Sequence, residues 1–299
     1  MNDYNEFKES FRPKDVLKVE ARTIKKTKIL MIDHETGEVL KELENKILVP
    51  GSQIAACKQF GLEPAVNFPT YNTLLELQNS LAPFPQTQPY NTPVICLWAA
   101  GRSGASSATE IFKVSTTDRI SPDKTTTTDN VEVYKDIVPF RYVTEDNDLD
   151  ADQRQVYFGR KVIPVSDGNR IAYFFKAFDT DPQLHVRYLD GTEVTANMYS
   201  IDSSQQVEVY VEMRLSITRK DFRDYFDEVL GWSSADISTI SLLCAWYDDT
   251  IVENPDASED DQIRYRWYQD ILPVTKFNFG QEELSNLNRT LDFVYQVYY

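Results

Sequence analysis

Apolar and polar residues alternate without a break over residues 206–218. Because successive side chains of a strand point to opposite faces, this pattern predicts a half-buried, antiparallel strand. A strand of this kind must be paired, so we expect each such segment to have a partner within the chain or in a neighbouring subunit. The same alternation runs through residues 290–299, where one face carries Leu291, Phe293, Tyr295, Val297 and Tyr299.

Three further segments are expected to form turns between strands. Apolar residues flank the sequence HETG within residues 28–43, the sequence DGN within 161–178 and the sequence DG within 184–196. Each turn sequence contains a glycine, which accepts the positive φ that a tight turn requires. Residues 94–100, VICLWAA, are expected to form a short buried strand.

Helical patterns are fewer and shorter. Residues 52–61 and 70–81 are expected to form short helices. A third helix is expected to begin at Thr218, because Thr218 and Asp221 have the spacing of a capping box, and to end near the next glycine. For residues 240–246, ISLLCAW, the pattern favours neither a buried strand nor a helix. Together these elements predict an α+β fold, dominated by antiparallel β-sheet in a sandwich-like or barrel-like arrangement, with a few short helices.

A run rich in Pro, Gln and Asn at residues 82–93, APFPQTQPYNTP, predicts a linker or a long loop. We therefore expect an N-terminal part, residues 1–95, with an arm, a β-hairpin and short helices. Residues 96–299 are expected to form a larger, β-rich assembly domain. Two polar stretches, 116–130 and 248–261, are expected to be exposed loops.

Composition limits the classes of function. With 41% hydrophobic and 12% aromatic residues, the chain has the apolar content of a folded protein. Its formal net charge of −16 argues against direct, sequence-specific nucleic-acid binding and against binding to anionic membranes. No apolar run approaches the roughly 18–20 residues that span a bilayer. The expected partners are therefore other proteins.

Three widely spaced cysteines, Cys57, Cys96 and Cys244, fit a reducing compartment better than a disulfide-stapled secreted domain. The first residues of the chain contain neither the basic segment nor the apolar segment of a secretory signal. We therefore expect a soluble protein that is made inside the cell.

No motif in the sequence predicts a catalytic or cofactor-binding site. The run GRSGASS, residues 101–107, lacks the lysine of a phosphate-binding loop. The acidic run TEDNDLDAD, residues 144–152, lacks the glycine and glutamate positions of an EF-hand, although an irregular cation site stays open as an alternative. His34 and His185 have no cysteines at zinc-ligand spacing, and the nucleophile elbow of serine hydrolases is absent. We therefore expect no catalytic residue, no cofactor, no metal and no enzymatic activity.

A short motif occurs twice, as YKDIVP at residues 134–139 and as YQDILP at residues 268–273. The flanking sequences differ, so we do not infer a duplicated domain. In both copies apolar residues lead into a proline, which cannot donate a hydrogen bond to a neighbouring strand. Each copy is therefore expected to mark a sheet edge or a bend, and such edges can be covered by a neighbouring subunit.

Several segments share an acidic, Tyr- and Asn-rich, β-dominated character. They are NKILVPGS and EPAVNFPTYN in the first part of the chain, FKAFDTDPQLHVRYLDGTEV in the middle, and DILPVTKFNF and LDFVYQVYY in the last part. In this character the chain resembles virion proteins of tailed bacteriophages, in particular those of the neck or head–tail connector and of the tail. The resemblance implies a structural, ring-forming role without catalysis, and it identifies no functional residue.

The expected function is that of a structural subunit of a bacteriophage virion, a neck, head–tail connector or tail protein that binds copies of itself and adjacent virion proteins. Its expected location is the virion, after synthesis in the cytoplasm of the host bacterium. Two alternatives stay open. One is a capsid-surface or fibre-attachment protein, and the other is a carbohydrate-binding or depolymerising module.

The distribution of charge suggests how such subunits would meet. Residues 14–28 contain six basic and two acidic residues, a balance of +4, whereas residues 248–261 contain seven acidic residues and no basic one. In a head-to-tail ring each subunit presents one surface to a different surface of its neighbour, so opposite charges on two segments favour contact. Buried aromatic residues of the last strand are expected to supply the affinity. The candidate interface residues are Lys14, Lys18, Arg22, Lys26, Phe293, Tyr295 and Val297.

Overall fold

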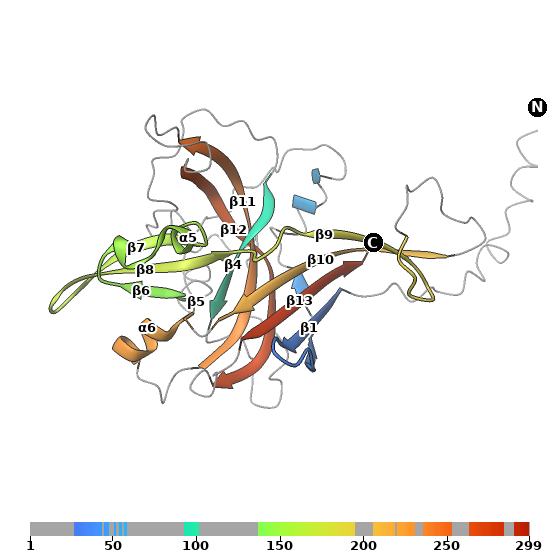
Figure 1. Ribbon diagram of the computed structural model, residues 1–299, viewed down its shortest axis with the longest axis horizontal. Helices are drawn as coiled ribbons and strands as arrows, with labels where there is room; N and C mark the ends of the chain where they lie inside the picture. Colours follow the sequence, from blue (N-terminus) through green and yellow to red (C-terminus); the bar gives the residue numbers. More distant parts are fainter. Residues whose placement is uncertain are drawn as a thin grey trace, which may run out of the picture.

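The computed structural model describes residues 27–43, 45–47, 93–101, 137–194, 206–218, 220–230, 236–252, 263–283 and 290–298, and single positions between 51 and 58. These residues form two antiparallel sheets, neither of which closes into a barrel (Figure 1). The expected α+β fold dominated by antiparallel sheet is therefore confirmed, and the open sheets correspond to its sandwich-like form. The short helical segments include η2 (Asp146–Asp148), α5 (Ala151–Arg154), α6 (Arg223–Tyr225) and the π-helical turn η4 (Phe226–Leu230).

The five-stranded sheet has the order β2-β1-β13-β10-β9. The expected hairpin of residues 28–43 is present, with Gly37 at a φ of 71° in its turn. β13 lies between β1 and β10, so that Phe293 is paired with Met31 on one side and with Leu215 on the other. The last alternating segment therefore finds its partners within the same chain. The strands of this sheet are β1 (Lys28–Asp33), β2 (Val39–Leu43), β9 (Gln183–Tyr188), β10 (Val207–Ile217) and β13 (Leu291–Tyr298).

The eight-stranded sheet follows the order β3-β12-β11-β4-β8-β6, with β5 paired to β4 and β7 paired to β8. The turn around DGN joins β7 and β8 as expected, since Val165 is paired with Gly168. The strands of this sheet are β3 (Asn45–Ile47), β4 (Val94–Gly101), β5 (Ile137–Val138), β6 (Arg141–Val143), β7 (Tyr157–Val165), β8 (Gly168–Ala177), β11 (Asp236–Val252) and β12 (Ile263–Glu283).

The long strand pair of β11 and β12 bears on three expectations from the sequence. The undecided segment 240–246 lies in β11 and is a strand. β11 continues to Val252, so the first residues of the loop expected at 248–261 belong to a strand instead, because they pair with the start of β12. The second copy of the repeated motif lies in β12, where Pro273 is opposite Leu243 and next to a register shift, as expected for a bend.

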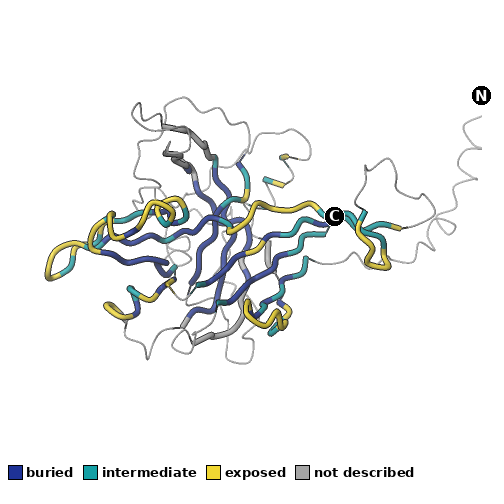
Figure 2. Tube along the Cα trace, in the orientation of Figure 1, coloured by how far each residue is buried: buried dark blue, intermediate teal, exposed yellow. Residues whose placement is uncertain are grey.

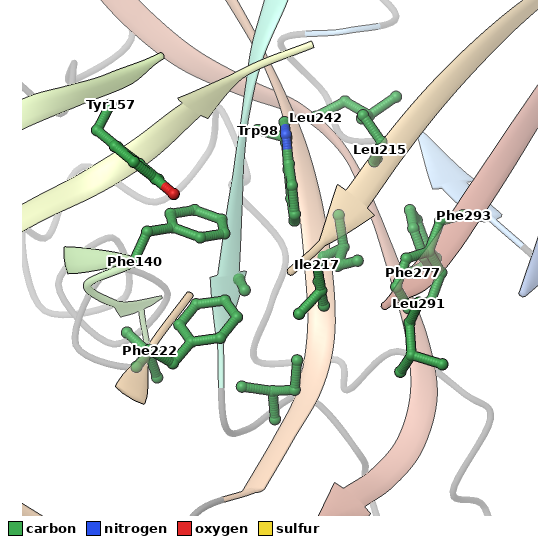
Figure 3. Close-up of a cluster of buried hydrophobic side chains, with 14 of the residues drawn as sticks. Trp98, Phe140, Tyr157, Leu215, Ile217, Phe222, Leu242, Phe277, Leu291 and Phe293 are labelled. Atoms are coloured by element: carbon green, nitrogen blue, oxygen red, sulfur yellow. The ribbon is translucent and has the colours of Figure 1, made fainter. Parts of the chain in front are cut away.

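The hydrophobic core lies between the two sheets (Figures 2 and 3). Alternate residues of β10 and β13 enter it from the five-stranded sheet, and residues of β4, β11 and β12 enter it from the other sheet. Phe277 and Phe293 meet across the sheets, with ring centroids 5.9 Å apart. In another part of the core the centroid of the Phe140 ring lies 4.7 Å from that of Trp98 and 4.6 Å from that of Phe222. These aromatic contacts hold the sheets face to face.

Both sheets combine segments that are far apart in the sequence. β1 and β2 belong to the sheet that contains β10 and β13, and β3 pairs with β12 of the other sheet. The division expected near residue 95 is therefore not a division between separate sheets, because early strands complete sheets that are built mainly from later residues. The helices expected at 52–61 and 70–81, the linker at 82–93 and the loop at 116–130 lie largely or wholly outside the described residues.

The helix expected to begin at Thr218 starts later and is shorter. After β10 the chain turns at Phe222, which has a φ of 67°, and the helical segment formed by α6 and η4 follows. Asp221 receives a hydrogen bond from the backbone of Thr218, as in a capping box, but it is buried and also binds Lys176. No helix in the described part of the chain is long and apolar enough to cross a membrane.

Gly159 of β7 is expected to tolerate no side chain. Its φ is 68°, and a Cβ atom at this position would lie 2.5 Å from ring carbon Cδ2 of the buried Phe175. The Gly159→Ala variant should therefore lose at least about 1–2 kcal/mol of unfolding free energy, the penalty for a side chain in the left-handed region. Urea unfolding followed by tryptophan fluorescence measures this loss.

Gly37→Ala provides the matched control for Gly159→Ala. Its φ of 71° is close to that of Gly159, but a Cβ atom at Gly37 meets nothing within 4 Å. The difference between the two variants therefore reports the contact with the Phe175 ring. Equal losses in both variants would show that this contact does not constrain the strand.

Candidate functional site

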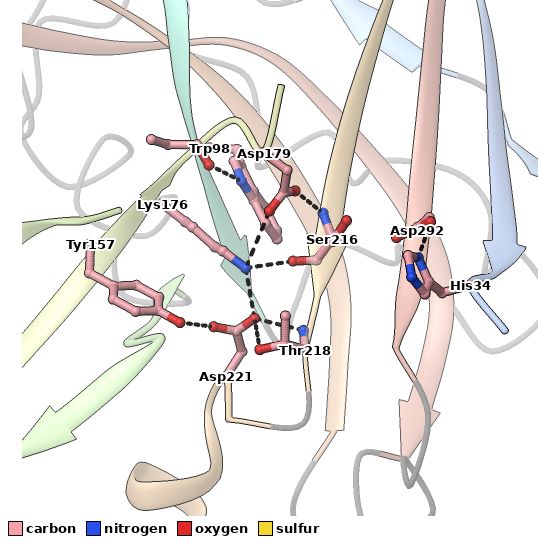
Figure 4. A network of polar contacts seen from close by, with 10 residues as sticks. His34, Trp98, Tyr157, Lys176, Asp179, Ser216, Thr218, Asp221 and Asp292 are labelled. Atoms are coloured by element: carbon pink, nitrogen blue, oxygen red, sulfur yellow. Dashed lines mark hydrogen bonds and ion pairs between the residues drawn. The ribbon is translucent and has the colours of Figure 1, made fainter. Parts of the chain in front are cut away.

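A buried charged cluster lies between β8 and the turn that follows β10 (Figure 4). The side chain of Lys176 is 3% exposed and that of Asp221 is 0% exposed. The Lys176 ammonium donates to Asp221 Oδ2 at 2.9 Å and to the backbone carbonyl of Ser216 at 2.7 Å. A second carboxyl group, that of Asp179, places its Oδ1 atom 4.0 Å from Lys176 Nζ. Charged groups buried this deeply are rare and persist only where they have partners.

The turn after β10 fixes the position of Asp221. Thr218 donates to Asp221 Oδ2 from its backbone nitrogen at 2.7 Å and from its hydroxyl at 3.0 Å. The backbone nitrogen of Asp221 donates back to the carbonyl of Thr218 at 3.1 Å. The next residue, Phe222, donates from its backbone nitrogen to the carbonyl of Phe140 at 2.7 Å, and the two rings pack together. Because the backbone and the core both anchor this turn, the carboxylate is held against Lys176.

The other oxygen of Asp221 accepts a hydrogen bond from Tyr157 of β7, whose hydroxyl lies 2.7 Å from Oδ1. Burial, and secondarily the charge of Asp221, raise the pKa of Tyr157 far above its ordinary value. The phenol therefore keeps its proton and acts as a donor. Lys176 Nζ also lies 5.7 Å from the ring centroid of Trp98 and 5.9 Å from that of Tyr157. Aromatic rings thus cover the ion pair on two sides.

Asp179 follows β8 and completes what we call the Lys176 cluster, which comprises Tyr157, Lys176, Asp179 and Asp221. Its Oδ2 atom accepts a hydrogen bond from the backbone nitrogen of Ser216 at 2.6 Å. Burial raises the pKa of Asp179, and the nearby Lys176 ammonium only partly opposes this effect. The cluster therefore combines one amine with two carboxyl groups, each held by hydrogen bonds from the backbone around β10. Such an arrangement can tie the sheets together, exchange a proton, and place an amine against a carboxyl carbon.

A second ion pair occupies the acidic segment at residues 144–152. Arg160 of β7 makes a two-point contact with Asp146, in which Nε lies 2.8 Å from Oδ1 and a terminal nitrogen lies 2.9 Å from Oδ2. The hydroxyl of Tyr173 also donates to Asp146. Burial opposes the charged form, but the hydrogen bonds from Arg160 and Tyr173 outweigh it and lower the pKa of Asp146. Among the described residues, no group of three His, Cys, Asp or Glu side chains is arranged to hold a metal ion.

The Asp146 ion pair predicts part of the response to acid. Because the pKa of Asp146 is lower in the folded chain than its ordinary value of 3.8, its contribution to stability is present above that value. The contribution is lost as the pH falls through the folded-state pKa. The unfolding free energy of Asp146→Asn should therefore fall less steeply on acidification than that of the wild type. Urea unfolding at a series of pH values measures both slopes.

The exposed Asp152, in the same segment, provides a control for the acid response. Asp152→Asn should retain the slope of the wild type, because Asp152 lies on the surface. Identical slopes for the wild type and Asp146→Asn would show that the Asp146 pair does not contribute to acid stability.

The two histidines contact carboxyl groups in separate parts of the structure. His34 Nδ1 lies 2.8 Å from Oδ2 of Asp292, whose side chain is 2% exposed. His185 Nδ1 lies 3.5 Å from a carboxylate oxygen of Glu193, and its ring stacks on Tyr210 with centroids 4.8 Å apart. The structure therefore does not bring the two imidazoles into a common site.

The part of the chain that carries most of the Lys176 cluster also matches a family model. The model, described as a family of unknown function (DUF7208), matches residues 40–205, which is more than half of the chain. The chain belongs to this family. No curated protein and no solved structure matches it. The DUF7208 region includes Tyr157, Lys176 and Asp179 but ends before Asp221.

The expected interface residues of this DUF7208 member differ in where the structure places them. Phe293 and Tyr295 are 0% and 3% exposed and belong to the core of a single chain, so they are unavailable to a neighbouring subunit. That expectation is corrected, because alternation indicates that one face of a strand is buried but not which chain buries it. Val297 is only partly buried and stays a candidate. The basic candidates lie outside the described residues: Lys14, Lys18, Arg22 and Lys26.

Sequence reasoning missed the Lys176 cluster. Lys176 stands in the run AYFFKAF, which contains no other charged residue, and a lysine in such a strand needs a buried partner. This apolar run around Lys176 was the signal in the sequence that a buried partner exists. The partner could not be named from it, because the chain contains 47 acidic residues and Asp221 lies 45 positions away.

Proposed function

We propose that this protein is a structural subunit of a tailed-bacteriophage particle, in the neck, the head–tail connector or the tail, and that it assembles with copies of itself and with adjacent virion proteins. The proposal rests on the strand pair of β9 and β10, which extends beyond the core (Figures 1 and 2) and includes exposed apolar residues. We call residues 183–189 and 207–211 the β9–β10 arm. The resemblance of the sequence to virion proteins supports the same class of function.

One face of the β9–β10 arm carries apolar residues. In the antiparallel pairing Leu184 is opposite Val211, and Val186 is opposite Val209, so their side chains share this face. Leu184 is 64% exposed, and Leu189 in the following turn is 58% exposed. The same face of β10 enters the core further along the strand. A row of apolar side chains that continues from a core onto the surface is typical of a protein interaction site.

Side-chain contacts stiffen the opposite face of the arm. Tyr210 stacks with His185 and with Tyr298, with ring centroids 4.8 Å and 5.2 Å away. The Arg187 guanidinium lies 4.9 Å from the centroid of the Tyr210 ring, and its Nε lies 3.2 Å from Glu208. A surface that is already ordered loses little entropy on binding, which favours association. Because Tyr210 is 4% exposed, its ring offers no open face to a sugar.

Mass photometry of the purified protein tests this proposal. We expect discrete oligomers of the wild type and their dissociation in the double variant Leu184→Asp/Leu189→Asp, because the new charges would be buried in the contact. Val162→Asp is the matched control, since Val162 is a 44% exposed residue of β7 outside the arm. This control should assemble like the wild type. Detection of the protein in purified phage particles would test its location.

Several outcomes would contradict the proposal. A wild type that stays monomeric at every concentration would exclude self-assembly, and an arm variant that assembles normally would exclude the arm. A monomer that binds or cuts glycans would instead favour a carbohydrate-binding or depolymerising module.

A further inference from the structure

The Lys176 cluster places an amine against a carboxyl group in a site shielded from water. We propose that Lys176 and Asp221 condense into an intramolecular amide, an isopeptide bond, and that Asp179 carries the proton between them. The bond would connect β8 to the turn after β10 and would link the two sheets covalently. The inference is independent of the proposed function, because it concerns the chemistry of a single chain.

The reacting groups are already adjacent. Lys176 Nζ lies 2.9 Å from Asp221 Oδ2 and therefore next to the carboxyl carbon that it would attack. The backbone of Thr218 holds the carboxyl group at 2.7 Å, and the carbonyl of Ser216 holds the amine at 2.7 Å. Positioning two reactants in this way replaces a bimolecular reaction by a much faster intramolecular one.

Condensation requires the uncharged forms of both groups. An ammonium has no free electron pair and a carboxylate resists attack, so one proton must first pass from Lys176 to Asp221. In water this transfer is strongly unfavourable, because the two groups differ widely in proton affinity. With side chains only 3% and 0% exposed, both groups are shielded from water, and the proton has to cross only the 2.9 Å between Nζ and Oδ2.

The condensation balances within the cluster. The neutral amine forms a C–N bond to Asp221 Cγ, and one electron pair moves onto Oδ1, which lies 2.7 Å from the Tyr157 hydroxyl donor. That hydroxyl stabilises the negative charge as an oxyanion-hole donor. Asp179 takes the proton that Nζ releases and delivers it to Oδ2. The Cγ–Oδ2 bond then breaks and Oδ2 leaves as water, so that ammonium and carboxylate become an amide and one water molecule.

Asp179 has the position and the proton affinity of a proton carrier. Its Oδ1 atom faces Lys176 Nζ at 4.0 Å, while its Oδ2 atom is held by the backbone of Ser216 at 2.6 Å. Burial raises the pKa of Asp179 and so brings its proton affinity closer to neutrality, where proton transfer is most effective. Tyr157 cannot replace it, because its own raised pKa keeps the proton on the phenol.

Such a bond would act on the unfolded chain as well as on the folded one. It would close a loop between positions that are 45 residues apart. Like a disulfide, it would reduce the freedom of the unfolded chain, and unlike a disulfide it would persist in a reducing compartment. It would also replace a buried pair of charges by a neutral amide.

Intact-mass spectrometry of the denatured full-length protein tests the proposal. We expect the wild-type chain to weigh one water molecule less than its sequence mass. A tryptic digest should contain a branched peptide in which Lys176 is joined to Asp221. Lys176→Arg keeps the positive charge but cannot form the amide, so it should show its full sequence mass. Asp179→Asn should fold, as judged by circular dichroism, yet most of its molecules should show the full sequence mass, because the amide does not form.

Three results would overturn the proposal or a part of it. A folded wild type of full sequence mass would leave Lys176 and Asp221 as an ion pair only. A water loss located elsewhere would exclude the isopeptide bond; the Asp-Gly sequences at 167–168 and 190–191 are the positions to inspect, because they can lose water by forming a cyclic imide. Complete condensation in Asp179→Asn would exclude the role assigned to Asp179.

Discussion

The Asp221→Ala variant is expected to lose about 3–5 kcal/mol of unfolding free energy, as is typical when one partner of a buried ion pair is removed. The Lys176 side chain, only 3% exposed, would lose the carboxyl group that accepts its hydrogen bond at 2.9 Å. The hydroxyl of Tyr157 and the backbone of Thr218 would lose their acceptor as well. Guanidinium chloride unfolding, followed by circular dichroism, measures the loss.

Two further variants separate charge from packing at this position. In Lys176→Met/Asp221→Leu both charges are replaced by apolar groups of similar volume, a change that is often neutral or stabilising. This double variant should therefore be more stable than Asp221→Ala. Glu42→Ala removes one partner of the exposed Lys28–Glu42 pair and should change stability by less than about 1 kcal/mol. If the double variant is no more stable than Asp221→Ala, the loss comes from the shape of the turn and not from the unpaired ammonium.

Deletion of residues 291–299 is expected to abolish folding, and not only assembly. β13 lies between β1 and β10, so its removal leaves each of these strands with an unpaired edge and divides the five-stranded sheet into two separate pairs. It also removes Leu291 and Phe293, both 0% exposed, from the core between the sheets. Far-ultraviolet circular dichroism and thermal unfolding should show no cooperative transition. A truncated protein that unfolds cooperatively as a monomer would show that this strand serves assembly, as the sequence had suggested.

Single substitutions in β13 give a graded version of the same test. Phe293→Ala should lose about 3–5 kcal/mol of unfolding free energy, the usual range for a buried phenylalanine. Val297→Ala should lose less, because Val297 is only partly buried. Equal losses at the two positions would contradict the placement of Phe293 in the core.

The comparison of β10 with β11 shows when the pattern of apolar residues is sufficient to predict a strand. β10 was predictable because the row of Met213, Leu215 and Ile217 faces the core, while the residues between them are more polar. β11 was not, because it is covered on both sides: Leu242 belongs to the core between the sheets and Leu243 to the cluster on the other face. A strand buried on both faces shows no alternation, and a short apolar run is equally compatible with a helix.

The pairing of distant segments was beyond the local pattern. His34 contacts Asp292, which lies 258 positions later in the sequence. Lys176 of β8 and Asp221 of the turn after β10 are likewise far apart in the sequence, and nothing in the spacing of either residue identifies the other. Local periodicity specifies that a face is buried, whereas the identity of the covering segment depends on which strands become neighbours. For this reason the fold class was predictable from the sequence, whereas the Lys176 cluster was not.

The central position of β13 also determines the order in which the protein can fold during translation. Lys28 of β1 is paired with Gln296 of β13, so β1 leaves the ribosome long before its neighbour is synthesised. At roughly 5–20 residues per second, this interval is on the order of 10–50 s. Throughout that time the edge of β1 that β13 later covers has no native partner, and open strand edges favour aggregation. Contacts of such high sequence separation also form slowly. Completion of the five-stranded sheet is therefore a late step that follows the synthesis of residues 291–298.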